Sequence, residues 1–251
     1  MPDLEDALEA YENNDYKTAF KIFMLLAEHG DAEAQSSLGN MYYNGEYVEQ
    51  DEEEAAKWIR LAAEQGHVDA QCMLGLMYGI GEGVVRDDEE GAKWLRLAAE
   101  QGHADAQNML GSMYFKGEGV VKNDKEAARW MRLAAEQGHA GAQSMFGLMC
   151  ANGEGVVKND EEAVEWLLLS AEQGNACAQS SLGVIFGEGL GVIQDSVQAH
   201  KWFKVSTVNG DEEEILLAIQ YMNSLEDEMT PDEIVEAQKL AREWMEEHGK
   251  E

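Results

Sequence analysis

The chain has 251 residues, of which 45% are hydrophobic and 27% are charged, and it contains two prolines, a composition typical of an ordered protein. Fifty acidic residues against eighteen Lys and Arg leave a net charge of −32. This charge repels phosphate backbones and anionic lipids, so neither nucleic acid nor a membrane surface is expected as a partner. The longest segment without Asp, Glu, Lys or Arg, 137–153, contains Gln, His and Gly and is too short and too polar to predict a membrane span.

The first residues, MPDLEDALEAYENND, lack the basic, apolar and small-residue order of a secretory signal. As the sequence stands, this is typical of a cytoplasmic protein. A periplasmic or secreted protein whose leader has been removed would look the same, so the compartment stays open.

The chain repeats itself every thirty-six residues. The string AAEQGH occurs at 62–67, 98–103 and 134–139, and GEGVV occurs at 81–85, 117–121 and 153–157. A tryptophan recurs with the same spacing, at Trp58, Trp94, Trp130, Trp166 and Trp202. A fixed period of this length is the sequence signature of a repeat architecture.

The elements expected in chain order begin with a helix pair at 4–13 and 15–29, which has Ile22 where the repeats have tryptophan. Each repeat then predicts two helices. In the second repeat the first of these, helix A, spans 69–78 and has Ala70, Leu74, Met77 and Tyr78 on one face. The second, helix B, spans 88–102 and has Gly91, Trp94, Leu95 and Ala98 on one face. A glycine-rich loop joins A to B, and Gly102 ends helix B.

The last elements depart from the repeat. Residues 211–224 predict a helix, and a final amphipathic helix follows with Thr230 as N-cap, Pro231 at its first position and Trp244 off the repeat register. The predicted organisation is a capping helix pair at 1–30, five repeats over 31–210 and capping helices at 211–251, in one continuous domain. A helical hairpin cannot bury its apolar face alone, so stacked antiparallel helix pairs, an all-α solenoid, are expected.

These features resemble the Sel-one-like repeat (SLR) family, bacterial relatives of tetratricopeptide repeats, over nearly the whole chain. The matching residues are Leu74-Gly75, the loop Gly81-Glu82-Gly83-Val84, the Ala/Trp/Ala-Ala pattern of helix B and the closing Gly102, with the final EMTPDEIVEAQKLAREW. The resemblance implies a right-handed superhelix whose A helices line a concave surface that binds other proteins. One cysteine-rich branch is linked to penicillin binding, but Cys72, Cys150 and Cys177 occupy three different repeat positions.

Most residues that suggest chemistry have a structural interpretation. His67, His103 and His139 occupy a position that also holds Asp31 and Asn175, which indicates helix N-caps. Equivalent positions of stacked helices are too far apart to share one zinc ion. The acidic runs lack the spacing of a calcium loop and open helices instead.

Three other recurring residue types also favour a structural role. The five glutamines at 35, 71, 107, 143 and 179 predict a structural hydrogen bond, and the cysteines are expected to fill the core. Most of the methionines are expected in the core, whereas Met73, Met109 and Met145 lie at its edge, where a contact role stays open. No cofactor, metal or catalytic residue is expected.

Positions that vary between repeats are candidates for binding, because positions that are kept build the scaffold. On helix A they form one largely neutral stripe, called here the helix A stripe. It comprises Ser36, Asn40, Tyr43, Asn44, Leu76, Ile80, Asn108, Ser112, Phe115, Lys116, Ser144, Leu148, Asn152, Ser180 and Val184.

The function expected from this pattern is a non-enzymatic interaction scaffold that holds a protein or peptide partner along this stripe. The acidic exterior favours a basic partner. Two alternatives stay open: an inhibitor or immunity-type protein that neutralises a toxin or enzyme, and a penicillin-interacting enzyme, for which the sequence offers no nucleophile.

Overall fold

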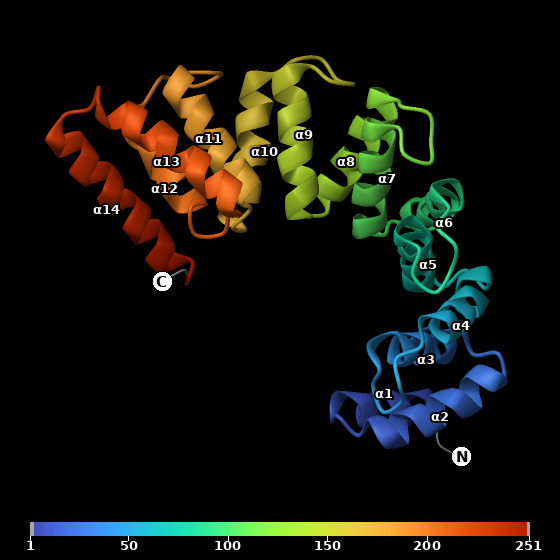
Figure 1. Ribbon diagram of the computed structural model, residues 1–251. Coiled ribbons are helices and arrows are strands. Elements are labelled where there is room, and N and C mark those ends of the chain that lie inside the picture. The colour runs from blue at the N-terminus through green and yellow to red at the C-terminus, as the bar shows by residue number, and fades with distance from the viewer. Residues whose placement is uncertain (1–2, 250–251) are drawn as a thin grey trace. The chain divides into compact units, whose positions relative to one another are not determined.

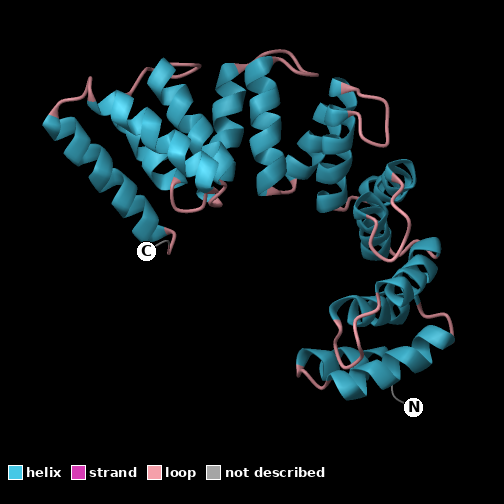
Figure 2. Ribbon diagram, in the orientation of Figure 1, coloured by secondary structure: helices cyan, strands magenta, loops and turns pink. Residues whose placement is uncertain are grey.

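The computed structural model describes residues 3–249, and within this range it contains helices, turns and loops but no strand (Figure 2). The described helices divide into two compact units, an N-terminal unit up to Asn123 and a C-terminal unit from Asp124. The boundary falls in the loop between helix A and helix B of the third repeat. No helix of the described residues combines the length and apolarity that a bilayer span requires.

The N-terminal unit holds the expected helix pair followed by two and a half repeats (Figure 1). Its helices are α1 (Leu4–Glu12), α2 (Tyr16–Glu28), α3 (Ala32–Asn44), α4 (Glu52–Glu64), α5 (Val68–Ile80), α6 (Asp88–Glu100) and α7 (Ala104–Lys116). Each helix packs on the next one from α1 to α7.

The C-terminal unit holds the remaining repeats and the terminal helices. Its helices are α8 (Asp124–Glu136), α9 (Ala140–Asn152), α10 (Asp160–Glu172), α11 (Ala176–Glu188), α12 (Ser196–Ser206), α13 (Glu212–Glu226) and α14 (Pro231–Glu247). The last helix packs on α12. There Trp244 meets Trp202 edge to face, with ring centroids 6.0 Å apart, and extends the core of the repeats.

These elements confirm the expected all-α solenoid of thirty-six-residue helix pairs. Helix A of the second repeat extends one residue before and two residues beyond the predicted 69–78. Thr230 caps α14 with Pro231 in its first turn, as predicted. The proposed division into one continuous domain with separate caps stays a prediction.

Two glycines allow successive helices and loops to approach closely. Within the second repeat, a Cβ on Gly75 would lie 2.7 Å from Cγ of Leu95 and 3.1 Å from the carbonyl oxygen of Gly91. Between repeats, a Cβ on Gly83 would lie only 1.9 Å from the carbonyl oxygen of Glu52, at a backbone φ of +65°. Because only glycine lacks a Cβ, it alone fits both contacts without a shift.

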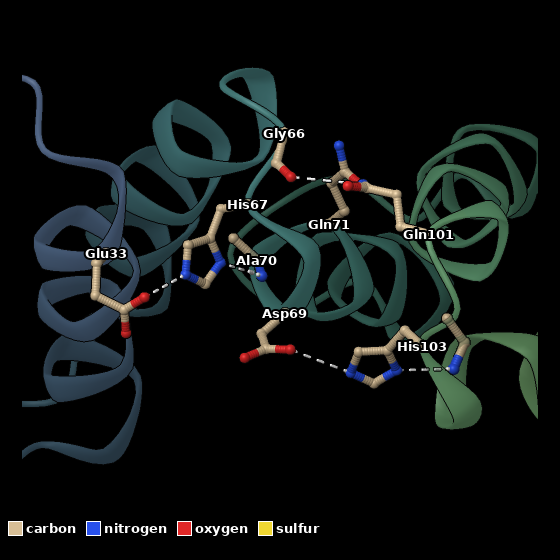
Figure 3. Close-up of polar contacts among 9 residues, drawn as sticks. Glu33, Gly66, His67, Asp69, Ala70, Gln71, Gln101 and His103 are labelled. Carbon is tan, nitrogen blue, oxygen red and sulfur yellow. Dashed lines mark hydrogen bonds and ion pairs between the residues drawn. The ribbon is translucent and has the colours of Figure 1, made fainter. Parts of the chain in front are cut away.

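Polar side chains also join neighbouring repeats (Figure 3). The buried Gln71 donates from Nε2 to the carbonyl of Ala63, while its Oε1 accepts a hydrogen bond from Nε2 of Gln101 at 2.7 Å. This confirms the structural hydrogen bond predicted for the glutamines. Pairing offsets the desolvation cost of the buried amide, and the bond from Gln71 to Ala63 fixes the second repeat against the first.

The histidines are N-caps, as predicted. Nδ1 of His67 accepts a hydrogen bond from the backbone N–H of Ala70 at 3.2 Å, and Nε2 lies 2.9 Å from a carboxylate oxygen of Glu33 in the preceding repeat (Figure 3). His103 caps α7 in the same way and faces Asp69 at 3.4 Å. These rings therefore satisfy helix ends and contact the neighbouring repeat.

Candidate functional site

The helix A stripe is placed by the helices that carry it. The A helices are α3, α5, α7, α9 and α11. Each begins at a capping side chain and ends at a glycine with positive φ. The stripe recurs on one side of these helices at spacings of three and four residues. Its exposure changes along the helix.

The first position of the stripe is largely covered. Ser36 and Ser144 are buried, and Asn108 and Ser180 are only partly exposed. The buried pair therefore offers a partner almost no surface.

The later positions of the stripe reach solvent. Ile80 is 57% exposed, and Asn40, Asn44, Lys116 and Asn152 are also exposed. Partly exposed members are Tyr43, Leu76, Ser112, Phe115, Leu148 and Val184. The accessible part of the stripe thus lies in the C-terminal half of each A helix.

Two aromatic members already have neighbours. The Tyr43 hydroxyl donates a hydrogen bond to Oε2 of Glu82 at 2.5 Å, and this bond together with burial raises the pKa of Tyr43. The Lys122 ammonium lies 5.3 Å from the centre of the Phe115 ring. Tyr43 joins two repeats, whereas the Phe115 ring is held next to a positive charge.

In the N-terminal unit, three members of the stripe line one shallow pocket of about 220 Å³. Leu76 and Ile80 come from α5 and Ser112 comes from α7. Met109 and Met113 line the same pocket. A contact role for Met109, left open by the sequence, would be exerted there. Met113 was expected in the core but is partly exposed. The pocket lies between two repeats, and most of its lining residues are apolar or glycine.

Charged side chains stand at the edge of this pocket. Arg86 makes two hydrogen bonds to the carboxylate of Asp88, at 3.0 and 3.1 Å, and Glu118 also lines the pocket. The ion pair with Asp88 raises the pKa of Arg86. Because the Arg86 charge is paired, the edge carries an acidic excess at Glu118.

In the C-terminal unit, a second pocket of about 260 Å³ contains two other members of the stripe. Ser180 and Val184 of α11 form one wall, and α12 and α13 complete it. The other lining residues are Cys177, Ser181, Phe203, Glu214, Leu217, Ala218 and Tyr221. Asn40, Asn44 and Asn152 line neither pocket, so the structure gathers only part of the predicted stripe.

The repeat pattern predicts α13 only as part of a cap, whereas in the structure α13 also lines this pocket. The available signal was the apolar run from Ile215 to Ile219, which is followed by Tyr221 and occupies every side of a helix. Four of its large side chains are exposed: Leu216, Leu217, Ile219 and Tyr221. An apolar run that a neighbouring helix covers on one side only has surface left for a partner.

The expectation that all three cysteines fill the core is wrong for Cys177, which is exposed at the start of α11. Cys72 and Cys150 are buried. Burial raises the pKa of the Cys72 thiol to about 12 and that of the Cys150 thiol to about 11, and nearby carboxylates add to both shifts. Only Cys177 combines an exposed thiol with a place in a pocket.

Within residues 3–249, no group of three or more His, Cys, Asp or Glu side chains is placed to hold a metal ion. The acidic runs open helices, where their charges meet the positive end of the helix dipole: Glu52, Glu53 and Glu54 form the first turn of α4 behind the N-cap Asp51. The pockets hold apolar side chains, hydroxyls and carboxylates, a set suited to holding another molecule by contact.

Comparison with known proteins identifies the repeat. The Sel1 repeat profile matches residues 32–67, 68–103, 104–139, 140–175 and 178–206. A crystal structure of a Sel1 repeat protein from Oxalobacter formigenes is 33% identical, with a TM-score of 0.83, and the match covers 98% of each chain.

Two further solved structures are more distant. A protective antigen of uropathogenic Escherichia coli with an SLR fold is 28% identical with a TM-score of 0.47, and the match covers 92% of this chain and 64% of that one. An immunity protein from Pseudomonas aeruginosa is 19% identical with a TM-score of 0.48, over 90% of this chain and 84% of that one. No curated protein matches the chain. The five matched repeats and the likeness to the Oxalobacter protein show that this chain belongs to the Sel1 repeat family.

Proposed function

We propose that this protein is a non-catalytic scaffold that holds a protein partner along the helix A stripe, with the two shallow pockets as its main contact points. Sel1 repeat proteins generally mediate protein–protein interaction, and the fold is typically a non-catalytic scaffold. The observation that carries the proposal is the convergence of Leu76, Ile80 and Ser112 on one pocket. These residues come from two repeats and vary between repeats, so scaffold construction alone does not account for them.

The pocket dimensions favour a protein over a small metabolite. At about 220 and 260 Å³, both pockets are smaller than a typical enclosed small-molecule site. A pocket of this size takes one or two side chains of a partner, as anchors at protein interfaces do. The net charge of −32 favours a basic partner and would speed its arrival at low salt.

The first test compares two substitutions in the same repeat. Ile80→Asp places a charge on the stripe, whereas Val85→Asp places the same charge on the loop after α5, at a side chain that is 88% exposed. Loss of an apolar anchor of this size costs about 1.5–3 kcal/mol, which is roughly tenfold or more in affinity. In a pull-down from the native cell read by mass spectrometry, Ile80→Asp is expected to lose the partner that wild type and Val85→Asp retain.

A second test addresses the polar part of the stripe on α7. Replacing Asn108, Ser112 and Phe115 with alanine is expected to weaken capture of the same partner while the melting temperature stays nearly constant, because none of the three is buried. Equal loss of capture and of stability would mean that these residues are scaffold. Equal capture by all variants would refute the stripe as the binding surface.

A further inference from the structure

We infer that the pocket between α11 and α13 is the anchor site for a basic amphipathic helix of the partner, which inserts a large apolar side chain while its Lys or Arg residues meet the acidic edge. This inference rests on the proposed function and names the chemistry of the partner at one site. All of its residues lie in the C-terminal unit.

The walls of this pocket are largely apolar, and the fold leaves part of this apolar surface exposed to solvent. Phe203 and Tyr221 stack in parallel, with centroids 4.9 Å apart and an interplanar angle of 4°, so that the ring of Tyr221 covers the buried ring of Phe203. Tyr221 remains 42% exposed and Leu217 remains 50% exposed. The buried cluster beneath them contains only Phe203, Ala218 and Met222, so α13 keeps more apolar surface than its own core covers.

The charges at the pocket have one sign. Glu214 lines it, and Asp211, Glu212 and Glu213 lie in the same first turn or cap of α13. No Lys, Arg or His is among the lining residues. An apolar segment with flanking cations matches both features, because its anchor buries apolar area while its cations are steered to the carboxylates.

The geometry favours a helical segment, because an amphipathic helix can lay one apolar face along a groove between two helices. A second copy of this chain is a poorer occupant. Its net charge of −32 would bring carboxylates against carboxylates. An acidic peptide is excluded for the same reason.

The test uses three synthetic helical peptides and the full chain. The first peptide has Leu and one Trp on one face and Lys on the other. The second has Glu for every Lys, and the third keeps Lys but has Ala for Leu and Trp. Binding is followed by anisotropy of labelled peptide, and the rate of alkylation of Cys177 by N-ethylmaleimide reports occupancy, because Cys177 lines the pocket and the other two cysteines are buried.

The matched variants are Leu217→Gln in the pocket and Ile193→Gln on a loop of the same unit, where the side chain is 90% exposed. We expect the Lys/Leu peptide to bind wild type and Ile193→Gln alike and to slow alkylation of Cys177. Its Kd should rise about tenfold in Leu217→Gln, the change that loss of one apolar anchor contact produces. Neither control peptide should protect Cys177.

Three results would overturn the inference. The first is equal affinity of the Lys/Leu peptide for Leu217→Gln and Ile193→Gln, which would mean attraction by charge alone. The others are binding of the Glu peptide as tight as that of the Lys/Leu peptide, and an alkylation rate of Cys177 that the Lys/Leu peptide leaves unchanged. Dimerisation of the wild type that Leu217→Gln abolishes in sedimentation would assign the pocket to a second copy instead. If the peptides fail while Ile80→Asp still loses the cellular partner, the scaffold function stands and only this anchor site is wrong. Circular dichroism melting of Leu217→Gln confirms that the variant folds.

Discussion

Nε2 of Gln101 donates a hydrogen bond to Oε1 of Gln71 at 2.7 Å, which ties the end of helix B to helix A within the second repeat. Gln71 is buried, and its own Nε2 donates to the carbonyl of Ala63 in α4. This one side chain of α5 therefore bonds both to α4 of the preceding repeat and to the end of α6 in its own repeat. The same arrangement recurs between Gln173 and Gln143 in the C-terminal unit. In a repeat protein, stability depends on such contacts between neighbours as well as on each repeat.

Removing either partner of this bond is expected to destabilise the protein. Gln71→Leu should lower the free energy of unfolding by about 1–3 kcal/mol, because it leaves buried polar groups without a partner. A double-mutant cycle with Gln101→Leu, measured by urea unfolding, should give an interaction energy of about 0.5–1.5 kcal/mol. Gln179, whose buried Oε1 has no partner among the described residues, offers the control: Gln179→Leu should cost less than Gln71→Leu. An interaction energy of zero would contradict this role.

Two glycines of α5 are expected to respond in opposite directions to the same substitution. Gly75→Ala places a Cβ 2.7 Å from Leu95 and should destabilise the protein by about 1–3 kcal/mol, and Gly75→Leu should cost more. Gly79 has nothing within 4 Å of its Cβ position, so Gly79→Ala should stabilise the helix by up to about 1 kcal/mol. Urea unfolding of the two alanine variants checks the sign of each change. Equal effects would mean that packing at Gly75 is loose.

The capping role of the histidines predicts which replacements of His103 are tolerated. His103→Asn keeps a side-chain acceptor for the N–H of Ala106, as Asn175 does for Ala178, and should change the melting temperature little. His103→Ala removes that acceptor and should cost about 1 kcal/mol. Thermal unfolding by circular dichroism measures both. If the two variants melted at the same temperature, the cap would contribute nothing.

The three thiols are expected to differ sharply in reactivity. Burial and raised pKa values keep Cys72 and Cys150 as protonated thiols at pH 8, and the thiolate is the reactive form. The folded protein should therefore release one equivalent of chromophore from a disulfide reagent, and the protein in guanidinium should release three. Peptide mapping should place the fast label on Cys177. Fast labelling of Cys72 in the folded state would contradict its burial.

The raised pKa of Cys72 also predicts a change of stability with pH. The folded state holds this proton more tightly than the unfolded state, so the stabilisation is present below the ordinary thiol pKa of 9.0 and is lost as the pH rises toward about 12. Between pH 8 and 11, wild type should lose more stability than Cys72→Ala, in which this titration is absent. Urea midpoints across that range measure the difference. Parallel pH profiles would show that the thiol is not linked to folding.

Much of the fold and part of the site could be predicted from the sequence. The thirty-six-residue period, the glycine past each helix and the apolar offsets of 69–78 and 88–102 are local signals, and they predicted the helix pairs to within a few residues. The glutamine at the position of Gln71 and the capping residue at the position of His67 recur in every repeat, and this recurrence predicted their structural roles, because a feature common to all repeats serves their common construction. The same comparison identified Leu76, Ile80 and Ser112, which meet in one pocket.

Only the tertiary structure decided which of these residues remain accessible. Ser36 and Ser144 vary between repeats as Ile80 does, yet neighbouring elements bury the two serines and leave Ile80 exposed. Cys177 and the apolar face of α13 became part of a pocket because α13 leaves much of its apolar surface uncovered. Helix formation depends on residues a few positions apart in the chain, whereas burial depends on side chains brought together from distant positions. The sequence alone therefore determined the elements and their repetition, and packing determined the surface that a partner can reach.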